Sequence, residues 1–319
     1  MIVGARTTDL MVAGVRTLCV EAGSGDKVIV LLHGGGFDYR ASTTAADWAV
    51  TIPDLVNRFG YHVHAFDLLG SGGTDGPAAD DQHTMTAVID HAWQTITALG
   101  IRRCAIVGHS RGGLVATSIA LDHPKVVAEL VLIGSNILAG RDPLVSPDFL
   151  DHAYREPGRV GTVETLRRIM ELNIFESTPA TEYLLARKVQ RLENAHPSRP
   201  QDETAVARLL DVVRRFFVPD MAAHKVAMCD RIRRGGLQPP TLLVWGLNDP
   251  SAPLKVGIDL YQLIGMNNHD TCLHVFNRSG HWSHVEHPDD FVDVLHSFLE
   301  RRPSSTYPRG TGGGVVSQE

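Results

Sequence analysis

One serine stands in a segment whose spacing suits nucleophilic chemistry, Gly108-His109-Ser110-Arg111-Gly112, which fits the pattern G-x-S-x-G. An apolar, β-branched run precedes the segment and an apolar helical stretch follows it, so the serine falls at a sharp strand-to-helix turn. Such a turn strains the backbone and leaves no room for a Cβ two residues away on either side, a demand that Gly108 and Gly112 meet. We therefore expect Ser110 to act as a nucleophile.

A serine hydroxyl needs a base to take its proton and a carboxylate to orient that base. Two later segments supply these groups: WGLNDP at 245–250 contains Asp249, and SGHW at 279–282 contains His281. Each segment follows a predicted strand, so both side chains are expected at carboxyl ends of strands, where open α/β sheets form their crevices. The chain order serine, aspartate, histidine completes a predicted catalytic triad of Ser110, Asp249 and His281.

Attack on a carbonyl also requires donors aimed at the developing oxyanion, each worth roughly 3 kcal/mol of barrier. The run HGGG at 33–36 directly follows the predicted strand 28–32, which is the usual position of an oxyanion loop. The backbone amides of Gly35 and Arg111 are expected to form the oxyanion hole. Gly34 and Gly36, in the same loop, are expected to contact the substrate.

Other motifs predict neither a metal nor a cofactor. The glycine-rich segment 70–76 lacks the G-x-G-x-x-G spacing, and no Lys-Ser or Lys-Thr follows it in a phosphate-binding pattern. His281, His284 and His287 recur at intervals of three, but Pro288 argues against a long helix there, and no carboxylate completes a known ligand pattern. The predicted chemistry has no redox step that would need a cofactor.

The elements that must position these residues alternate between short β-rich runs and longer amphipathic stretches. This alternation predicts the α/β class, with a mostly parallel central sheet flanked by helices. An antiparallel pair is expected around 8–21, and helices are expected at 85–99, 111–122 and 289–301. The predicted strands are 28–32, 62–67, 104–108, 129–133, 241–245 and 272–276.

The alternation fails in residues 141–236, which are rich in Arg and Glu and show helical periodicity over 162–175, 181–194 and 204–217. We predict that 141–236 is a helical insertion, called the cap below, between two parts of one core. Residues 1–140 and 237–302 are expected to form that core, because strands on either side of an insertion can still pair. The tail 303–319 has loop composition and is expected to be flexible.

Composition limits the partners of the 319-residue chain. It is 43% hydrophobic and carries a formal net charge of −6, which gives no basic field for nucleic acid. The four cysteines lie far apart without a CxxC pair, as in proteins of a reducing compartment. Residues 1–10 contain no continuous apolar run, and the run at 28–32 is too short to cross a membrane. We expect a soluble cytoplasmic protein without a membrane partner.

From about residue 8 to residue 301 the chain resembles the α/β-hydrolases, and within them the meta-cleavage product hydrolases. Those enzymes cut a carbon–carbon bond in 2-hydroxy-6-oxo-hexa-2,4-dienoates made by aromatic ring fission. Three segments carry the narrower resemblance: HGGG at 33–36, LHVF at 273–276 with GHW at 280–282 and EHP at 286–288, and a cap segment from 156 to 187 that ends on the family's arginine.

The resemblance implies an α/β-hydrolase fold with an inserted helical cap and a small-molecule substrate that bears a carboxylate. Arg187 is the expected clamp for this carboxylate, because a guanidinium can bind it bidentately. Trp282 is the expected wall of the substrate site. The alternative, purely structural interpretations are an exposed helix arginine for Arg187 and ordinary core packing for Trp282. Homo-oligomers are common in the family.

The resemblance also implies that the dienol first isomerises to a keto form, and that either Ser110 or a water activated at the same place attacks the ketone. The sequence departs from the family at His109, where asparagine is common, at Arg111, where methionine is frequent, and in the loop 37–48. These departures bear on the substrate more than on the triad. Hydrolysis of an ester, lactone or thioester, and a non-catalytic ligand-binding scaffold, therefore stay as alternatives.

Overall fold

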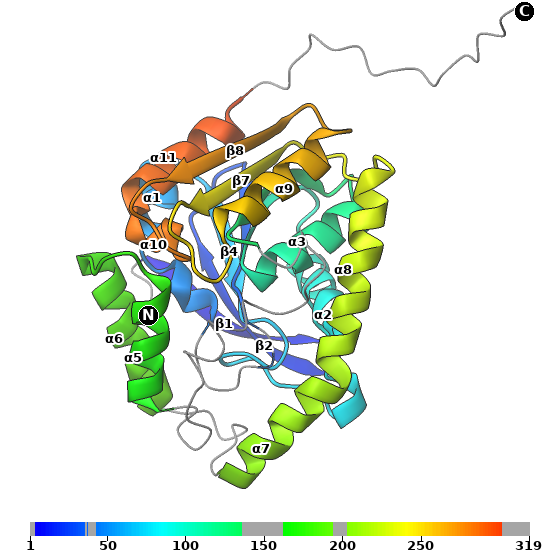
Figure 1. The fold of residues 1–319 in the computed structure, drawn as a ribbon, viewed down its shortest axis with the longest axis vertical. Coiled ribbons are helices and arrows are strands. Elements are labelled where there is room, and N and C mark those ends of the chain that lie inside the picture. Colours follow the sequence, from blue (N-terminus) through cyan, green and yellow to red (C-terminus); the bar gives the residue numbers. More distant parts are fainter. Residues whose placement is uncertain (1–3, 36, 38–42, 136–161, 194–202, 302–319) are drawn as a thin grey trace, which may run out of the picture.

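The computed structural model describes residues 4–35, 37, 43–135, 162–193 and 203–301. Their strands form one eight-stranded sheet in the order β1-β2-β4-β3-β5-β6-β7-β8 (Figure 1). Strand β2 pairs antiparallel with both β1 and β4. The six strands from β4 to β8 in this order run parallel to one another. The strands are β1 (Ala5–Val12), β2 (Val15–Ala22), β3 (Val28–Leu32), β4 (His62–Phe66), β5 (Cys104–His109), β6 (Val127–Ile133), β7 (Thr241–Gly246) and β8 (Thr271–Phe276).

The predicted strands are confirmed, each of the six parallel ones to within two residues at either end. They are recognisable because a strand buried on both faces needs a continuous apolar run, and every residue of β5 is buried. The predicted antiparallel pair is also confirmed and begins earlier, at Ala5.

Helices cover both faces of the sheet and give it two apolar layers. One layer contains α2 (Met85–Ala98), α3 (Arg111–Asp122) and α9 (Leu254–Gly265). The other contains η1 (Ala45–Trp48), α1 (Ile52–Asn57) and α11 (Pro288–Leu299). Two short helices, η2 (Asp80–Gln82) and α10 (Ser283–Glu286), complete this part of the chain.

The described part of the cap is helical, as predicted. Helices α5 (Val163–Asn173) and α6 (Pro179–Glu193) lie together at one side of the molecule (Figure 1). Helix α7 (Glu203–Val212) continues through a π-helical turn (Val213–Phe217) into α8 (Val218–Arg233), so the helix expected to end at 217 runs on to Arg233. Pro219 lacks an N–H and cannot complete a regular ladder, which accounts for the local widening. The predicted cap boundary at 141 and the tail 303–319 lie outside the described residues.

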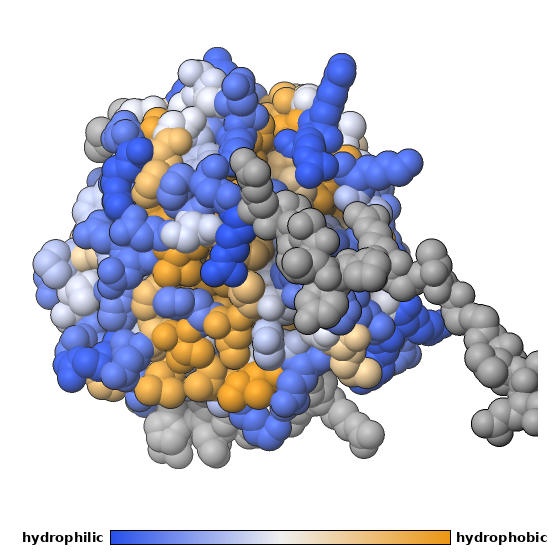
Figure 2. All heavy atoms as spheres, turned by 90° about the horizontal axis from the view of Figure 1, so that it is seen from above, coloured by the Kyte–Doolittle hydropathy of each residue, from blue (hydrophilic) through white to orange (hydrophobic). Residues whose placement is uncertain are grey.

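The surface seen from above, where α11, β8 and α9 lie in Figure 1, mixes hydrophilic side chains with an apolar area (Figure 2). Large exposed apolar residues of these elements include Ile258, Tyr261 and Val275. Within the described ranges, every helix is too short or too polar to span a bilayer.

Candidate active site

Ser110 occupies the strained turn between β5 and α3. Its backbone adopts φ 53° and ψ −122°, a region that residues with a side chain seldom occupy. A Cβ on Gly108 would lie 2.4 Å from the carbonyl oxygen of Gly112, and one on Gly112 would lie 2.5 Å from that of His33. The steric demand inferred from the sequence is therefore present, and the turn holds the serine at the carboxyl end of the sheet.

The predicted acid and base are in direct contact. His281 Nδ1 lies 2.8 Å from Oδ2 of Asp249, and both residues are buried. The other carboxylate oxygen of Asp249 accepts hydrogen bonds from the amides of Ser251 and Ala252, at 2.8 and 2.7 Å. These bonds fix the carboxylate as an acceptor, so Nδ1 of His281 is the donor and Nε2 is left as the basic nitrogen.

The turn at Ser110 and the loop that carries His281 are linked by the residue before the nucleophile. The ring of His109 makes a 3.0 Å hydrogen bond through Nε2 to the carbonyl oxygen of His281. From the other side, Ser110 N donates to Ile133 O, and the next residue, Gly134, is so close that a Cβ would lie 3.1 Å from His281 Nδ1. The structure gives no hydrogen bond between the Ser110 hydroxyl and His281.

The predicted oxyanion loop is held by a buried histidine. Nε2 of His33 accepts the amide of Leu68 at 2.9 Å, and its Nδ1 lies 2.6 Å from the carbonyl oxygen of Gly34. Burial lowers the pKa of His33, which keeps the ring neutral with its proton on Nδ1. Gly35 has φ +72°, and a Cβ there would lie 2.2 Å from the Thr43 hydroxyl, so glycine is required. Gly36 lies outside the described residues.

Arg111, the other predicted oxyanion donor, is the first residue of α3, where a backbone N–H has no acceptor within its own helix. Its guanidinium lies 5.7 Å from the ring of Phe217, in the π-helical turn of the cap. The side chain at this family-divergent position therefore faces the cap.

The last residue of cap helix α5 joins the loops of the acid and the base. Asn173 is buried, and its backbone carbonyl accepts the amide of His281 at 2.7 Å. Its side-chain oxygen accepts the hydroxyl of Ser251 at 2.5 Å, two residues after Asp249. The amide group of Asn173 also donates to Ile169 O, which fixes its orientation. One cap residue thus positions both halves of the Asp249–His281 pair.

The buried carboxylate of Glu286 also links the loop of His281 to the cap. Glu286 accepts the amide of Gly280 through one oxygen, at 2.8 Å, and the amide of Phe175 through the other, at 2.7 Å. Burial raises the pKa of Glu286 despite these hydrogen bonds. The glutamate therefore holds the segment before His281 against the residues that follow α5.

Trp282 and Arg187, the predicted substrate contacts, take different positions. Trp282 is buried and packs with Met170, Leu184 and Val285 in a small apolar cluster between cap and core. This contact supports the packing interpretation and also places the ring directly after His281. Arg187, on α6, is half-buried with its guanidinium 5.9 Å from the ring of Tyr183.

The next residue of α6 is one that sequence reasoning missed. Lys188 is fully buried, and its ammonium lies 3.0 and 2.9 Å from the two oxygens of Asp47, which is also buried. Arg191 contacts the same carboxylate at 3.1 Å. Lys188 Nζ is also 4.6 Å from the centre of the Trp282 ring, within the range of a cation–π interaction. The available sequence signal was the position of the lysine, four residues after Leu184 and so on the same face of an amphipathic helix.

The three histidines at intervals of three have separate surroundings. His281 contacts Asp249, and Nε2 of His287 lies 3.2 Å from the carbonyl oxygen of Arg278. His284 is fully buried, with its ring 4.6 Å from Trp48 and 4.7 Å from His109. These three rings therefore do not converge on one point.

Comparisons with known proteins agree with this architecture. The family model of the alpha/beta hydrolase fold matches residues 27–288. The chain is 30% identical over 290 residues to the 2-hydroxy-6-oxononadienedioate/2-hydroxy-6-oxononatrienedioate hydrolase of Paraburkholderia xenovorans (strain LB400), covering 88% of this chain and 89% of the relative. It is 28% identical over 291 residues to the 2-hydroxymuconate semialdehyde hydrolase of Pseudomonas sp. (strain CF600), covering 91% and 93%.

Among solved structures, a mutant of the meta-cleavage product hydrolase CumD superposes with a TM-score of 0.64 at 25% identity. This match covers 92% of the chain and 97% of the CumD chain. The similarity therefore extends over the sheet domain and the insertion, beyond the serine motif alone.

Proposed function

The chain belongs to the α/β-hydrolase family, and from this membership and the site geometry we propose that it hydrolyses a carbon–carbon bond in a 2-hydroxy-6-oxo-hexa-2,4-dienoate. The observation that carries the proposal is the 2.8 Å contact of His281 with Asp249 beside the strained Ser110 turn, in a chain whose relatives act on such substrates. The reaction belongs to the degradation of aromatic compounds.

His281 acts as the general base in this proposal. Asp249 holds the proton on Nδ1, so Nε2 accepts the proton of the attacking group, either the Ser110 hydroxyl or a water at the same position. The Asp249 charge then stabilises the imidazolium. The buried surroundings of both residues strengthen this interaction relative to water.

The bond that breaks needs a carbanion equivalent as its leaving group. Conversion of the dienol to its keto tautomer provides one, because the departing fragment then leaves as a stabilised enolate. One water is consumed, the ketone carbon becomes a carboxylic acid, and the enolate takes up the proton held by His281. The amides of Gly35 and Arg111 stabilise the negative charge that develops on the ketone oxygen.

Recognition of the substrate carboxylate is assigned to Arg187, with Trp282 beside His281 as an apolar wall. The positions that support this are α6, which carries Arg187 on the cap, and the cluster that joins Trp282 to α5 and α6. Lys188 is assigned a different role, because Asp47 already neutralises its charge.

The experiment mixes the full-length protein with several yellow ring-fission products and follows the loss of colour. Mass spectrometry of the two acids released identifies the bond cut and the preferred side chain. Ser110→Ala is expected to abolish turnover with unchanged circular dichroism. Faster turnover of neutral aryl esters than of any dienoate would contradict the proposal and favour an esterase. Full activity in Ser110→Ala would exclude Ser110 as the attacking group.

Two properties of the whole protein follow as further proposals. The four cysteines are all free thiols, which supports residence in the reducing cytoplasm. A homo-oligomer stays a prediction, for which light scattering of the purified chain is the measurement.

A further inference from the structure

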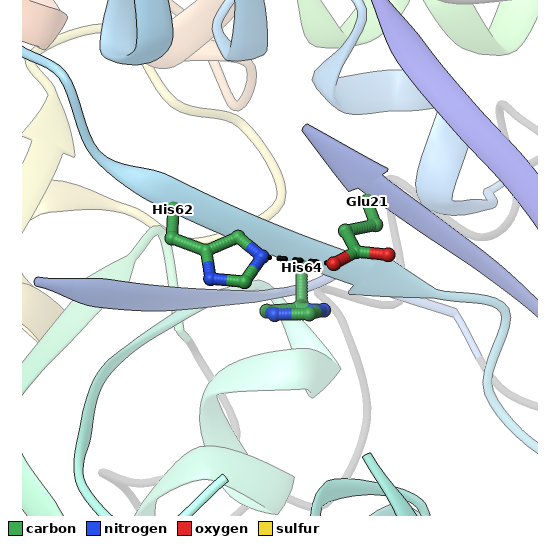
Figure 3. A group of neighbouring side chains, drawn as sticks. All are labelled: Glu21, His62 and His64. Carbon is green, nitrogen blue, oxygen red and sulfur yellow. Dashed lines mark hydrogen bonds and ion pairs between the residues drawn. The ribbon is translucent and has the colours of Figure 1, made fainter. Parts of the chain in front are cut away.

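A separate group of ionisable side chains lies across β2 and β4. Glu21 and His64 are opposite each other in the register of these strands, and His62 stands two residues before His64. One ligand atom from each of the three side chains lies within 4.8 Å of the others. Figure 3 shows the carboxylate and the two imidazoles converging between the strands. In the ranges that the structure describes, this is the only such set of three metal-ligand residues.

The alternation of a β-strand places all three side chains on one face of the sheet. The neighbours of Glu21, Val20 and Ala22, belong to the apolar layer beneath α1 and α11, as do Val63 and Ala65 on β4. Glu21, His62 and His64 therefore point to the opposite face. This arrangement depends on the pairing of two strands that are distant in sequence, so spacing along the chain does not reveal it.

The surroundings of the three side chains leave room for a ligand. His64 is only 5% exposed, and neither ring nitrogen has a hydrogen-bond partner within the described residues. His62 and Glu21 are partly exposed, so an ion can reach the group from solvent. In the metal-free chain His62 Nε2 is hydrogen-bonded to Glu21 Oε1, and a bound ion would displace the proton of this bond.

We propose that Glu21, His62 and His64 bind a divalent transition-metal ion, with zinc the best match. Two imidazole nitrogens and one carboxylate oxygen are an established zinc ligand set, to which water adds a fourth position. His62 Nε2 and Glu21 Oε1 are 3.0 Å apart, close to the roughly 3.3 Å between ligand atoms in a tetrahedron with zinc bonds of about 2.0–2.1 Å. The His64 ligand atom lies within 4.8 Å of the other two and would move closer to them when the ion binds.

The ion would crosslink strands β2 and β4 of the sheet. The β1–β2 hairpin joins the remaining strands through the ladder that pairs Cys19–Ala22 with Val63–Phe66. A metal held by β2 and β4 together crosslinks this ladder and stabilises the folded state by mass action. The site has no part in catalysis, because His62 pairs with Val28 at the start of β3 whereas the oxyanion loop follows its end at Leu32.

Calorimetric titration of the untagged full-length protein with zinc chloride tests the proposal. One zinc ion per chain is expected, and cobalt is expected to give the visible absorption of a tetrahedral site. His64→Gln, His62→Gln and Glu21→Gln should each weaken binding by at least about tenfold. Because His62 and Glu21 are partly exposed, their variants keep the test valid even if His64→Gln fails to fold.

His224→Gln is the matched control. His224 also pairs with a carboxylate, Asp220 at 3.9 Å, but it belongs to no set of three ligands. This variant is expected to bind zinc as the wild type does. Zinc should also raise the melting temperature of the wild type and leave that of His62→Gln unchanged. Absence of zinc binding to the wild type, or wild-type affinity in the three cluster variants, would overturn the proposal.

Discussion

The ammonium group of Lys188, on cap helix α6, lies 2.9 Å from Oδ2 of Asp47, on η1 beside the oxyanion loop, and both side chains are excluded from solvent. Although burial opposes its charge, Lys188 and then Arg191 hold the pKa of Asp47 below its usual value. Because the folded-state pKa is depressed, the stabilisation is present above the ordinary carboxyl pKa of 3.8 and is lost as the pH falls below it. The ion pair fastens the cap to the core.

Replacing Lys188 with methionine tests this attachment. The substitution leaves the Asp47 charge buried with one cation fewer, so the free energy of unfolding is expected to fall by about 3–5 kcal/mol at neutral pH. Urea denaturation measures the loss. Lys255→Met is the control, since Lys255 forms an exposed pair with Asp259 and should cost at most about 0.5 kcal/mol. Equal losses in the two variants would show that burial of the pair has no special effect.

Asp249→Asn separates the orientation of His281 from the fold around it. The asparagine oxygen can still accept the amides of Ser251 and Ala252, so the turn should persist. The Asn amide group would face Nδ1 and favour the wrong tautomer, and kcat is expected to drop by about 10⁴-fold. Steady-state kinetics and the melting temperature are the measurements. A loss in kcat below tenfold would remove Asp249 from the triad.

Arg187→Ala tests the assignment of the carboxylate clamp. Loss of a charged hydrogen-bond donor is expected to raise KM for a carboxylate-bearing dienoate by roughly 10- to 100-fold and to leave a neutral aryl ester almost unaffected. Arg231→Ala is the control, because Arg231 contacts Asp122, the last residue of α3, at the end of that helix opposite Ser110. Similar losses on both substrates would mean that Arg187 supports the cap instead of binding the substrate.

His284 predicts a pH dependence of stability. Burial lowers its pKa to about 3, and neither ring nitrogen has a hydrogen-bond partner within the described residues. In the unfolded chain this histidine binds a proton near pH 6.5, whereas in the folded chain it stays neutral until about pH 3. The free energy of unfolding is therefore highest above pH 6.5 and decreases as the pH falls toward 3.

His284→Phe should remove this contribution. A phenyl ring fits the aromatic surroundings of Trp48 and His109, and the slope of unfolding free energy against pH is expected to decrease by about 1.4 kcal/mol per pH unit between pH 6 and 4. Urea denaturation at several pH values measures the slope, with the exposed His269→Phe as the comparison. An unchanged slope would contradict a neutral, buried His284.

The parts predicted from the sequence are those that local rules determine. Strand β5 is predictable because an apolar run must be buried on both faces, and the Ser110 turn is predictable because Gly108 and Gly112 meet a steric demand within five residues. The placement of Asp249 and His281 needed only the rule that parallel strands end at one edge. Their hydrogen bond follows from that topology.

The parts that sequence missed depend on contacts between distant elements. Lys188 lies in a charged segment of the kind that usually forms a solvated helix face. Only the packing of α6 on η1 brings Lys188 to Asp47. The helix predicted over 204–217 stops short of α8, which follows without a break through a π-helical turn and has Pro219 in its first turn. Glu21 meets His64 only through the register of an antiparallel ladder.

The bridge that Asn173 makes bears on attempts to rebuild this protein. Its carbonyl and side chain hold the segments of His281 and Asp249 at once, so the inserted helices are not an interchangeable module. A chimera that receives a foreign lid for a new substrate must also retain an asparagine at the junction of α5. Otherwise the graft would misalign the proton-transfer pair even when the transplanted helices fold correctly.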